Sequence, residues 1–140
     1  MRIADIMTQR IVTVDMDDTV KVIHDIFKQV KFHHILVINK NKHLQGVISD
    51  RDILKSLSPY LDTPSELPRD AATLRKHAHQ VMTRHPVTIY DDETVMQGIH
   101  RFLEQSVSCL PVLNRDEEVQ GILSWRDVFR AIAHQSDTKE

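Results

Sequence analysis

The sequence has little cysteine and no long apolar run. Cys109 is the only cysteine among 140 residues, which excludes an intrachain disulfide framework and a zinc site built on several cysteines. The longest apolar run without a proline, residues 35–38, is far too short to span a membrane as a helix. The first residues also lack the apolar stretch of a secretory signal. We therefore expect a cytoplasmic protein with no membrane partner.

The chain also lacks an excess of charge of either sign. It carries 18 Lys and Arg against 20 Asp and Glu, for a net charge of −2. This balance excludes a strongly cationic chain that would hold nucleic acid by bulk electrostatics, so we expect no nucleic-acid partner. Hydrophobic residues make up 41% and charged residues 27%, which is typical of a globular fold rather than of a disordered chain.

Motifs of the common catalytic machineries are missing too. The sequence has no Walker phosphate loop, no nucleophile elbow and no paired acid–base motif. We therefore expect no enzymatic activity and no catalytic cofactor. A phosphohydrolase that uses Asp52 or Asp127 stays open as an alternative.

What the chain does contain is an internal repeat. When the sequence is slid along itself so that Met7 falls on Met82, two halves align without a gap. The longest match joins residues 45–52 to residues 120–127, and both segments run from a glutamine to an aspartate. We infer that the chain arose by duplication.

Each copy has the same order of apolar patterns. The first copy predicts a strand over 12–14, a helix over 18–31, a hairpin of strands over 35–38 and 44–48, and a helix over 49–57. The second predicts a strand near Val87, a helix over 93–105, strands over 110–113 and 119–123, and a helix over 125–133. The fold class is therefore α+β, with two pseudo-symmetric β-α-β-β-α repeats packed through their sheets.

The segment between the copies differs in composition. It holds three of the five prolines, Pro59, Pro64 and Pro68, as expected of a linker. A short helix is predicted over 70–78, with Asp70 as its cap. These features predict a first repeat over 1–58, a linker over 59–78, a second repeat over 79–134 and a C-terminal tail over 135–140.

The strongest candidate site is the junction where a strand gives way to a helix in each copy, at residues 46–52 and 121–127. Helix N–H groups without intrahelical partners suit a phosphate there. A serine can add a hydroxyl donor, an arginine a charged fork, and an aspartate can accept hydrogen bonds from two vicinal hydroxyls. That combination is suited to a ribose phosphate. The residues are Ser49, Arg51 and Asp52 in the first copy and Ser124, Arg126 and Asp127 in the second.

The same pattern has a purely structural interpretation. Ser-x-x-Asp before an apolar run is also a capping box, which satisfies helix N–H groups without any ligand. Two features favour a ligand. An arginine in the first helical turn opposes the helix dipole, yet both copies have one. The residue before that arginine also differs between the copies (Asp50 and Trp125), whereas the serine, arginine and aspartate do not.

Taken together, the motifs resemble a tandem cystathionine-β-synthase (CBS) domain pair. They are Asp-Ile-Met-Thr at 5–8 and Gln-Val-Met-Thr at 80–83, the Val-Thr-Val and Val-Thr-Ile strands, Leu-Pro-Val at 110–112, and the two junctions. The resemblance implies the CBS-pair fold and a regulatory module that binds an adenosine-type ligand in a cleft between the repeats. AMP is the first choice, and ADP, ATP and S-adenosylmethionine are the other ligands that the resemblance implies. It further implies a homodimer and an effector protein in trans; an interaction module without ligand is the alternative.

The resemblance also assigns roles to single residues. Ser49 and Ser124 would lie near phosphate, with Arg51 and Arg126 as partners, and Asp52 and Asp127 would accept ribose hydroxyls. The remaining ligand contacts would come from Thr13, Val14, Thr88, Ile89, Leu110 and Pro111. His34 is a candidate ligand contact for a different reason, its position just before a buried strand. One site would pair Asp127 with Thr13, and the other Asp52 with Thr88. The sequence departs from the family at Leu36, where the proline seen at Pro111 is common.

The remaining candidates are weaker. His33-His34 and His77-x-His79 suggest a metal, but we expect a helix to separate His77 from His79, and no further ligand completes a site, so no metal is predicted. Cys109 is expected to be a small buried filler.

Trp125 is expected to be a half-buried aromatic at the start of a helix, with stacking on a base or support of a partner surface as the alternatives. Met7 and Met82 are expected to pack in the core near the pocket.

Overall fold

The chain forms two compact units. The computed structural model describes the backbone of residues 1–139 and the side chains of residues 1–136. One unit, here called the middle unit, is Val12–His85. The other, the end unit, combines Met1–Ile11 with the chain from Pro86 onward. Each unit has its own sheet and its own hydrophobic cluster.

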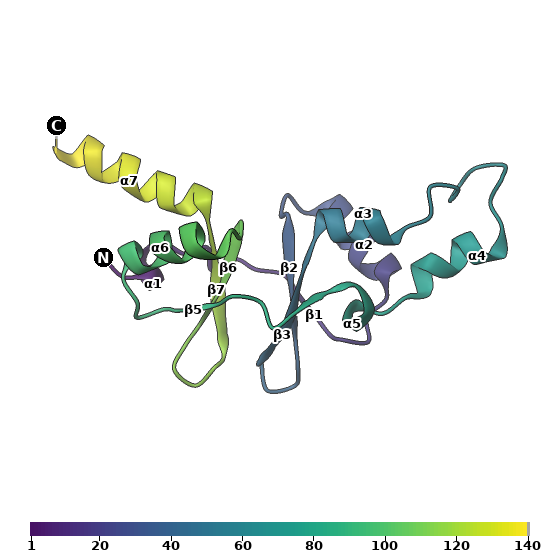
Figure 1. Ribbon diagram of the computed structural model, residues 1–140, viewed down its shortest axis with the longest axis horizontal. Helices are drawn as coiled ribbons and strands as arrows, with labels where there is room; N and C mark the ends of the chain where they lie inside the picture. Colours follow the sequence, from purple (N-terminus) through teal and green to yellow (C-terminus); the bar gives the residue numbers. More distant parts are fainter. Residues whose placement is uncertain (140) are drawn as a thin grey trace. The chain divides into compact units, whose positions relative to one another are not determined.

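The middle unit is built on a sheet with the strand order β1-β2-β3-β4. Figure 1 labels the first three of these strands. Strand β1 runs parallel to β2, whereas β3 is antiparallel to both β2 and β4. Its elements are β1 (Thr13–Val14), α2 (Val20–Gln29), β2 (His34–Ile38), β3 (Leu44–Ser49), α3 (Asp50–Ser56), α4 (Pro68–Ala71), the 3-10 helix η1 (Ala72–Arg75), α5 (Ala78–Val81) and β4 (Thr83–Arg84).

The end unit repeats this plan with the strand order β5-β6-β7. Strand β5 is parallel to β6, and β6 and β7 form an antiparallel hairpin with the same register shift as the hairpin of the middle unit. Its elements are α1 (Ile3–Ile6), β5 (Ile89–Tyr90), α6 (Val95–Gln105), β6 (Cys109–Leu113), β7 (Val119–Ser124) and α7 (Trp125–Lys139). The predicted α+β class with a β-α-β-β-α order in each copy is confirmed.

The first long helix of each unit begins at a threonine cap. The Thr19 hydroxyl accepts a hydrogen bond from the Val22 N–H at 3.3 Å, and the Thr94 hydroxyl accepts one from the Gln97 N–H at 3.1 Å. These contacts satisfy N–H groups that have no partner within the helix. The apolar side of each helix is then buried against its own sheet, as the 3.6-residue period predicts.

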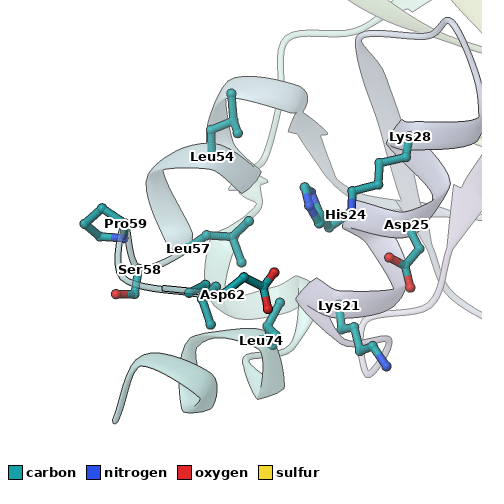
Figure 2. Close-up of a pocket in the computed structure, with 11 residues that line it drawn as sticks. Lys21, His24, Asp25, Lys28, Leu54, Leu57, Ser58, Pro59, Asp62 and Leu74 are labelled. Atoms are coloured by element: carbon teal, nitrogen blue, oxygen red, sulfur yellow. The ribbon is translucent and has the colours of Figure 1, made fainter. Parts of the chain in front are cut away.

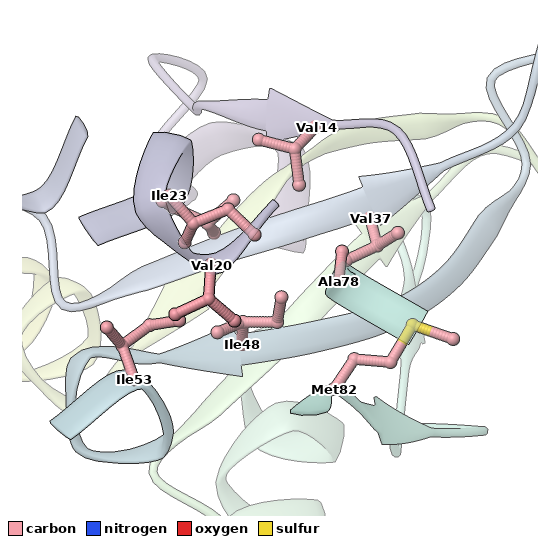
Figure 3. Close-up of a cluster of buried hydrophobic side chains, with 9 residues drawn as sticks. Val14, Val20, Ile23, Val37, Ile48, Ile53, Ala78 and Met82 are labelled. Atoms are coloured by element: carbon pink, nitrogen blue, oxygen red, sulfur yellow. The ribbon is translucent and has the colours of Figure 1, made fainter. Parts of the chain in front are cut away.

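The core of the middle unit lies between the sheet and helices α2, α3 and α5 (Figure 3). Val20 and Ile23 of α2 and Ile48 of β3 are completely buried. Burying a side chain of this size stabilises the fold by about 1.5–3 kcal/mol. Met82, predicted to pack in the core, belongs to the same cluster.

The core of the end unit is centred on Phe102 of α6. Phe102 is 1% exposed, and its ring stacks on Trp125 with ring centroids 5.0 Å apart. The Trp125 ring in turn lies against that of Phe129, with ring centroids 5.7 Å apart. Trp125 is half-buried at the start of α7, which confirms the structural interpretation of this tryptophan. Met7 packs against this cluster, as predicted.

The opening segment of each sequence repeat packs on the hairpin of the other repeat. Thr8 bridges to Ile122 of β7, and Thr83 of β4 pairs with Val47 of β3. The glycines of the two hairpins make this approach possible, because a Cβ on Gly121 would lie 2.6 Å from the Thr8 carbonyl oxygen. A Cβ on Gly46 would lie 2.8 Å from the Thr83 carbonyl oxygen. The compact units therefore differ in extent from the copies seen in the sequence.

The linker differs from the helix predicted over 70–78. It forms two short turns of helix, α4 and η1, and then α5, whereas Asp70 lies inside α4 rather than at its cap. The Asp70 carboxylate accepts hydrogen bonds from the Leu67 N–H at 2.8 Å and the Ser58 hydroxyl at 2.7 Å, and both hold its pKa below the usual value. Proline at position 68 starts the helix two residues early because its fixed φ suits a first helical position.

The C-terminal part of the chain is more regular than expected. Residues 135–139, expected to be a tail, continue α7. Within residues 1–139 no helix has both the length and the apolar character that a membrane crossing requires.

Candidate functional site

The junction between β3 and α3 is the first of the two predicted sites. Each strand-to-helix junction, with its serine, arginine and aspartate, is here called an entrance. Ser49 ends the strand and caps the helix: its hydroxyl accepts a hydrogen bond from the Asp52 N–H at 3.1 Å. The Asp52 carboxylate returns the contact by accepting from the Ser49 N–H at 2.8 Å. The capping box foreseen as a structural alternative is therefore present, and it uses one of the two acceptor positions on Asp52 Oδ2.

The junction between β7 and α7 has the same residues but a denser set of hydrogen bonds. The Asp127 carboxylate accepts from both the N–H and the hydroxyl of Ser124, at 2.9 and 3.1 Å. It also accepts from the hydroxyl of Thr8 at 2.9 Å. Asp127 is only 4% exposed, whereas Asp52 is half-buried. The two entrances therefore have the same backbone arrangement but differ in the burial of the carboxylate and in the hydrogen bonds that it accepts.

The predicted phosphate partners lie on the surface. Arg51 and Arg126 are both exposed in the first turn of their helices. Neither guanidinium makes a hydrogen bond or ion pair with the part of the chain that the structure describes. Each is therefore free to form the bidentate contact that a guanidinium makes with phosphate.

His34 flanks the first entrance. It lies opposite Ser49 in the β2–β3 register, so the imidazole and the serine occupy neighbouring strands. Burial lowers the pKa of His34, although the nearby Asp50 carboxylate opposes that effect. Asp50 itself is held at a lowered pKa by His33, whose Nδ1 lies 2.9 Å from its carboxylate. A neutral imidazole next to Ser49 can accept a proton when an anion binds nearby.

Cys109 occupies the corresponding place beside the second entrance. It lies opposite Ser124 in the β6–β7 register and is 8% exposed. Burial raises the pKa of its thiol to about 12. A thiol in this state is an inert filler, as predicted, and not a nucleophile.

Most predicted residues of the base pocket have buried side chains. Val14, Ile89 and Leu110 belong to the hydrophobic clusters of their own units, and Pro111 is buried as well. Thr13 is exposed, and Thr88 is half-buried with its carbonyl accepting a hydrogen bond from Arg101 at 3.2 Å. These positions therefore offer a ligand mainly backbone atoms and threonine methyl groups.

The two histidine pairs do not form a metal centre. His77 caps α5 and its ring stacks on that of His79 with centroids 5.5 Å apart, so the expectation that a helix separates them was wrong. The short helix begins only after His77, which leaves the two rings on one side. No group of three His, Cys, Asp or Glu side chains that could hold a metal occurs among the described residues.

A separate hollow of about 650 Å³ lies in the middle unit, between α2, α3 and the loop that follows α3 (Figure 2). The side chains of α2 that line it are Lys21, His24, Asp25 and Lys28. Their three- and four-residue spacing marks one polar face of α2, which the sequence analysis did not single out. In the end unit a hollow of about 340 Å³ is bordered by Asp127, Arg130 and His134.

The two halves of the chain match one family profile. A profile described as the CBS domain matches residues 3–59 and again residues 78–134, which together make up most of the chain. The chain belongs to the CBS-domain family.

Solved CBS-pair structures have the same fold over nearly the whole chain. The structure of CBSX2 in complex with AMP has a TM-score of 0.80 and 26% identity, and the match covers 96% of this chain and 98% of that one. CBSX2 from Arabidopsis thaliana gives 27% identity, a TM-score of 0.80 and coverage of 97% and 96%. The CBS domain pair of MJ0100, in complex with 5′-methylthioadenosine and S-adenosyl-L-methionine, has the same fold with a TM-score of 0.77 and 21% identity, covering 96% and 98%.

Relatives by sequence carry CBS domains in different contexts. A CBS domain-containing protein from Dictyostelium discoideum is 27% identical over 128 residues, which are 91% of this chain and 88% of that protein. Homoserine O-acetyltransferase from Methanococcoides burtonii is 25% identical over 93% of this chain, but the match spans only 24% of the enzyme. The likeness to that enzyme is therefore confined to about a quarter of its length.

Proposed function

We propose that this CBS-domain protein is a regulatory module without catalytic activity that binds an adenine nucleotide, with AMP as the first candidate. The observation that carries the proposal is the serine–arginine–aspartate entrance at the start of α3 and again at the start of α7. The CBS-pair relative CBSX2, 26% identical, has been crystallised with AMP. ATP, ADP and S-adenosylmethionine are alternative ligands of the same chemical class.

The chemistry of the entrances supports this ligand class. Arg51 has an exposed guanidinium without a protein partner in the described residues, as a phosphate contact requires. An aspartate at the same entrance can accept from two vicinal ribose hydroxyls. The base would be held by the strand segments at Thr13 and Thr88, through backbone atoms. The pairing of Asp52 with Thr88 and of Asp127 with Thr13 stays a prediction.

Signalling would follow from a shift between conformations of the chain. A nucleotide that binds one arrangement more tightly than another moves the population toward it, and an effector protein in trans would read the difference.

A homodimer is part of the proposal and is supported by apolar side chains exposed on the helices of the end unit. Met96, Phe129 and Ile132 are 59%, 60% and 50% exposed. Such side chains gain by burial against a second copy. Light scattering should give the mass of a dimer for the wild type and of a monomer for Ile132→Asp, and a monomeric wild type would contradict this part of the proposal.

Thermal unfolding in the presence of nucleotides tests the proposal directly. A ligand at a hundredfold excess over its Kd adds about 2.7 kcal/mol to the free energy of unfolding. We expect AMP or another adenine nucleotide to raise the Tm in proportion to the logarithm of the nucleotide concentration. GMP, which keeps the ribose phosphate and changes the base, is the matched control and should give a smaller rise.

Two other outcomes would overturn the proposal. If no adenine compound shifts the Tm at millimolar concentration, the chain is an interaction module without a nucleotide ligand. If ATP with magnesium is hydrolysed at a rate that Asp52→Asn abolishes, the chain is a phosphohydrolase.

A further inference from the structure

The two entrances differ in the acceptor capacity of their carboxylates. An ionised carboxylate has about four acceptor positions, two on each oxygen. Asp127 Oδ2 accepts from the Ser124 N–H at 2.9 Å and from the Ser124 hydroxyl at 3.1 Å, which fills both of its positions. Asp127 Oδ1 accepts from the Thr8 hydroxyl at 2.9 Å, and Arg130 Nη1 lies 3.7 Å from the same oxygen. Two vicinal hydroxyls need one open position on each oxygen, and Oδ2 has none.

The Asp52 carboxylate accepts fewer hydrogen bonds than the Asp127 carboxylate. Its Oδ2 accepts one hydrogen bond, from the Ser49 N–H at 2.8 Å. Its Oδ1 accepts no hydrogen bond from any part of the chain that the structure describes. Both oxygens of Asp52 therefore keep a position for a ligand hydroxyl while the capping contact stays intact.

The serine hydroxyls show the same contrast. The Ser124 hydroxyl accepts from the Asp127 N–H at 3.4 Å and donates its own proton to the Asp127 carboxylate. The Ser49 hydroxyl likewise accepts from the Asp52 N–H, but its own proton has no acceptor among the described residues. Ser49 can thus donate to a ligand oxygen without giving up a protein contact, whereas Ser124 cannot.

The source of the contrast is a side chain and not the backbone. Thr8 and Thr83 are corresponding residues of the two opening segments, and they hold the same register, opposite Ile122 and Val47. Thr8 is half-buried and its hydroxyl reaches Asp127. Thr83 is exposed, and its hydroxyl makes no hydrogen bond to the described residues.

The hollow of about 340 Å³ beside Asp127 does not restore a ribose site. A ligand in it would meet Arg130 and His134, but the Asp127 carboxylate is 4% exposed and its Oδ2 is already saturated.

We infer that Asp127 is a structural residue that holds the opening segment to α7, and that the chain binds one nucleotide, with Asp52 as its ribose acceptor, rather than two. This inference rests on the proposed function. It replaces two equivalent sites with one site and one structural hydrogen-bond cluster of similar sequence.

Calorimetric titration of the full chain with AMP, and separately with ATP, tests the inference. Wild type should take up one equivalent per chain. Ser49→Ala and Ser124→Ala form a matched pair, because each removes a helix cap of the same kind. We expect Ser49→Ala and Asp52→Asn to weaken binding at least tenfold, while Ser124→Ala leaves the Kd within twofold.

Thr8→Val keeps the test valid where a change at Asp127 or Ser124 prevents folding. It removes only the hydroxyl donor, and it should leave the Kd within twofold. Two equivalents per wild-type chain, or a tenfold loss in Ser124→Ala or Thr8→Val with a folded circular-dichroism spectrum, would overturn the inference alone. Failure of folded wild type to bind either nucleotide would instead overturn the proposed function and the inference with it.

Discussion

The hydroxyl of Thr8 donates a 2.9 Å hydrogen bond to the carboxylate of Asp127, across 119 residues of sequence. The bond attaches the opening segment of the first repeat to the last helix of the second. Because Asp127 is buried, the bond also replaces part of the hydration that the carboxylate loses, together with the two hydrogen bonds from Ser124. Removal of this one hydroxyl should therefore lower the stability of the whole end unit.

We predict that Thr8→Val lowers the free energy of unfolding by about 1–2 kcal/mol, since a hydrogen bond to a charged group contributes in this range. Urea unfolding followed by circular dichroism measures the change. Thr83→Val is the matched control, because Thr83 holds the same register but makes no side-chain hydrogen bond to the described residues. Equal losses in the two variants would show that the Thr8 hydroxyl has no special role.

Gly121→Ala should destabilise the chain by about 1–3 kcal/mol, the usual cost of forcing an atom into a packed interior. The added Cβ would lie 2.6 Å from the backbone oxygen of Thr8, which cannot move without shifting the opening segment.

Gly98→Ala is the control for that change. Its Cβ would meet the flexible ends of Ile3 and Leu123 at 3.0 and 3.2 Å, and alanine favours the interior of helix α6 by about 1 kcal/mol. We expect a smaller loss for Gly98→Ala in the same urea titration. A larger loss for Gly98→Ala than for Gly121→Ala would contradict the packing that we describe.

Acid stability should depend on the ion pair of Arg101 and Glu93. Two hydrogen bonds of 2.9 Å from the guanidinium hold the pKa of Glu93 below its usual value of 4.5. A carboxyl whose pKa is lower in the folded chain contributes stability that is complete above about pH 4.5 and is lost as the pH falls through the lowered value.

We predict that Arg101→Met costs about 1–3 kcal/mol at pH 7, and that the difference from wild type shrinks as the pH falls below 4.5. Unfolding curves recorded from pH 3 to pH 7, at steps of about one pH unit, measure this difference in the free energy of unfolding. Arg115→Met is the control, since Arg115 and Asp92 are 62% and 52% exposed and their ion pair is screened by water. It should have the smaller effect, and a pH-independent difference for Arg101→Met would contradict the assignment to Glu93.

His34 should couple nucleotide binding to proton uptake. Burial lowers the pKa of His34, against the opposing charges of Asp50 and Asp52 and together with the neighbouring His33. The free chain therefore loses stability as the pH falls below 6.5, because the unfolded chain binds the proton more readily. A phosphate beside the imidazole would raise its pKa again, so that AMP binding tightens as the pH falls from about 7 toward 6.

Titration of AMP in two buffers of different ionisation enthalpy measures the protons taken up. We expect net proton uptake in wild type and none in His34→Gln, with His43→Gln as a control on another surface of the same unit. Equal uptake in wild type and His34→Gln would show that another group accepts the proton.

The sequence by itself determined the repeat, the order of the elements and the location of the entrances. Helical spacing in 18–31 and 93–105 required apolar faces to be buried, and the structure buries Val20 and Phe102 there. Ser49 and Asp52 were found because local hydrogen bonds between residues three apart fix a helix start, whatever the rest of the chain does.

Only the tertiary structure decided which residues from distant segments meet. No spacing rule links Thr8 to Asp127, because the contact depends on an opening segment that crosses to the other hairpin. The stacking of His77 on His79 likewise depended on where α5 begins, within a stretch too short for periodicity to fix. Identical motifs thus acquire different roles, because hydrogen-bond capacity is shared among neighbours that the sequence does not place together.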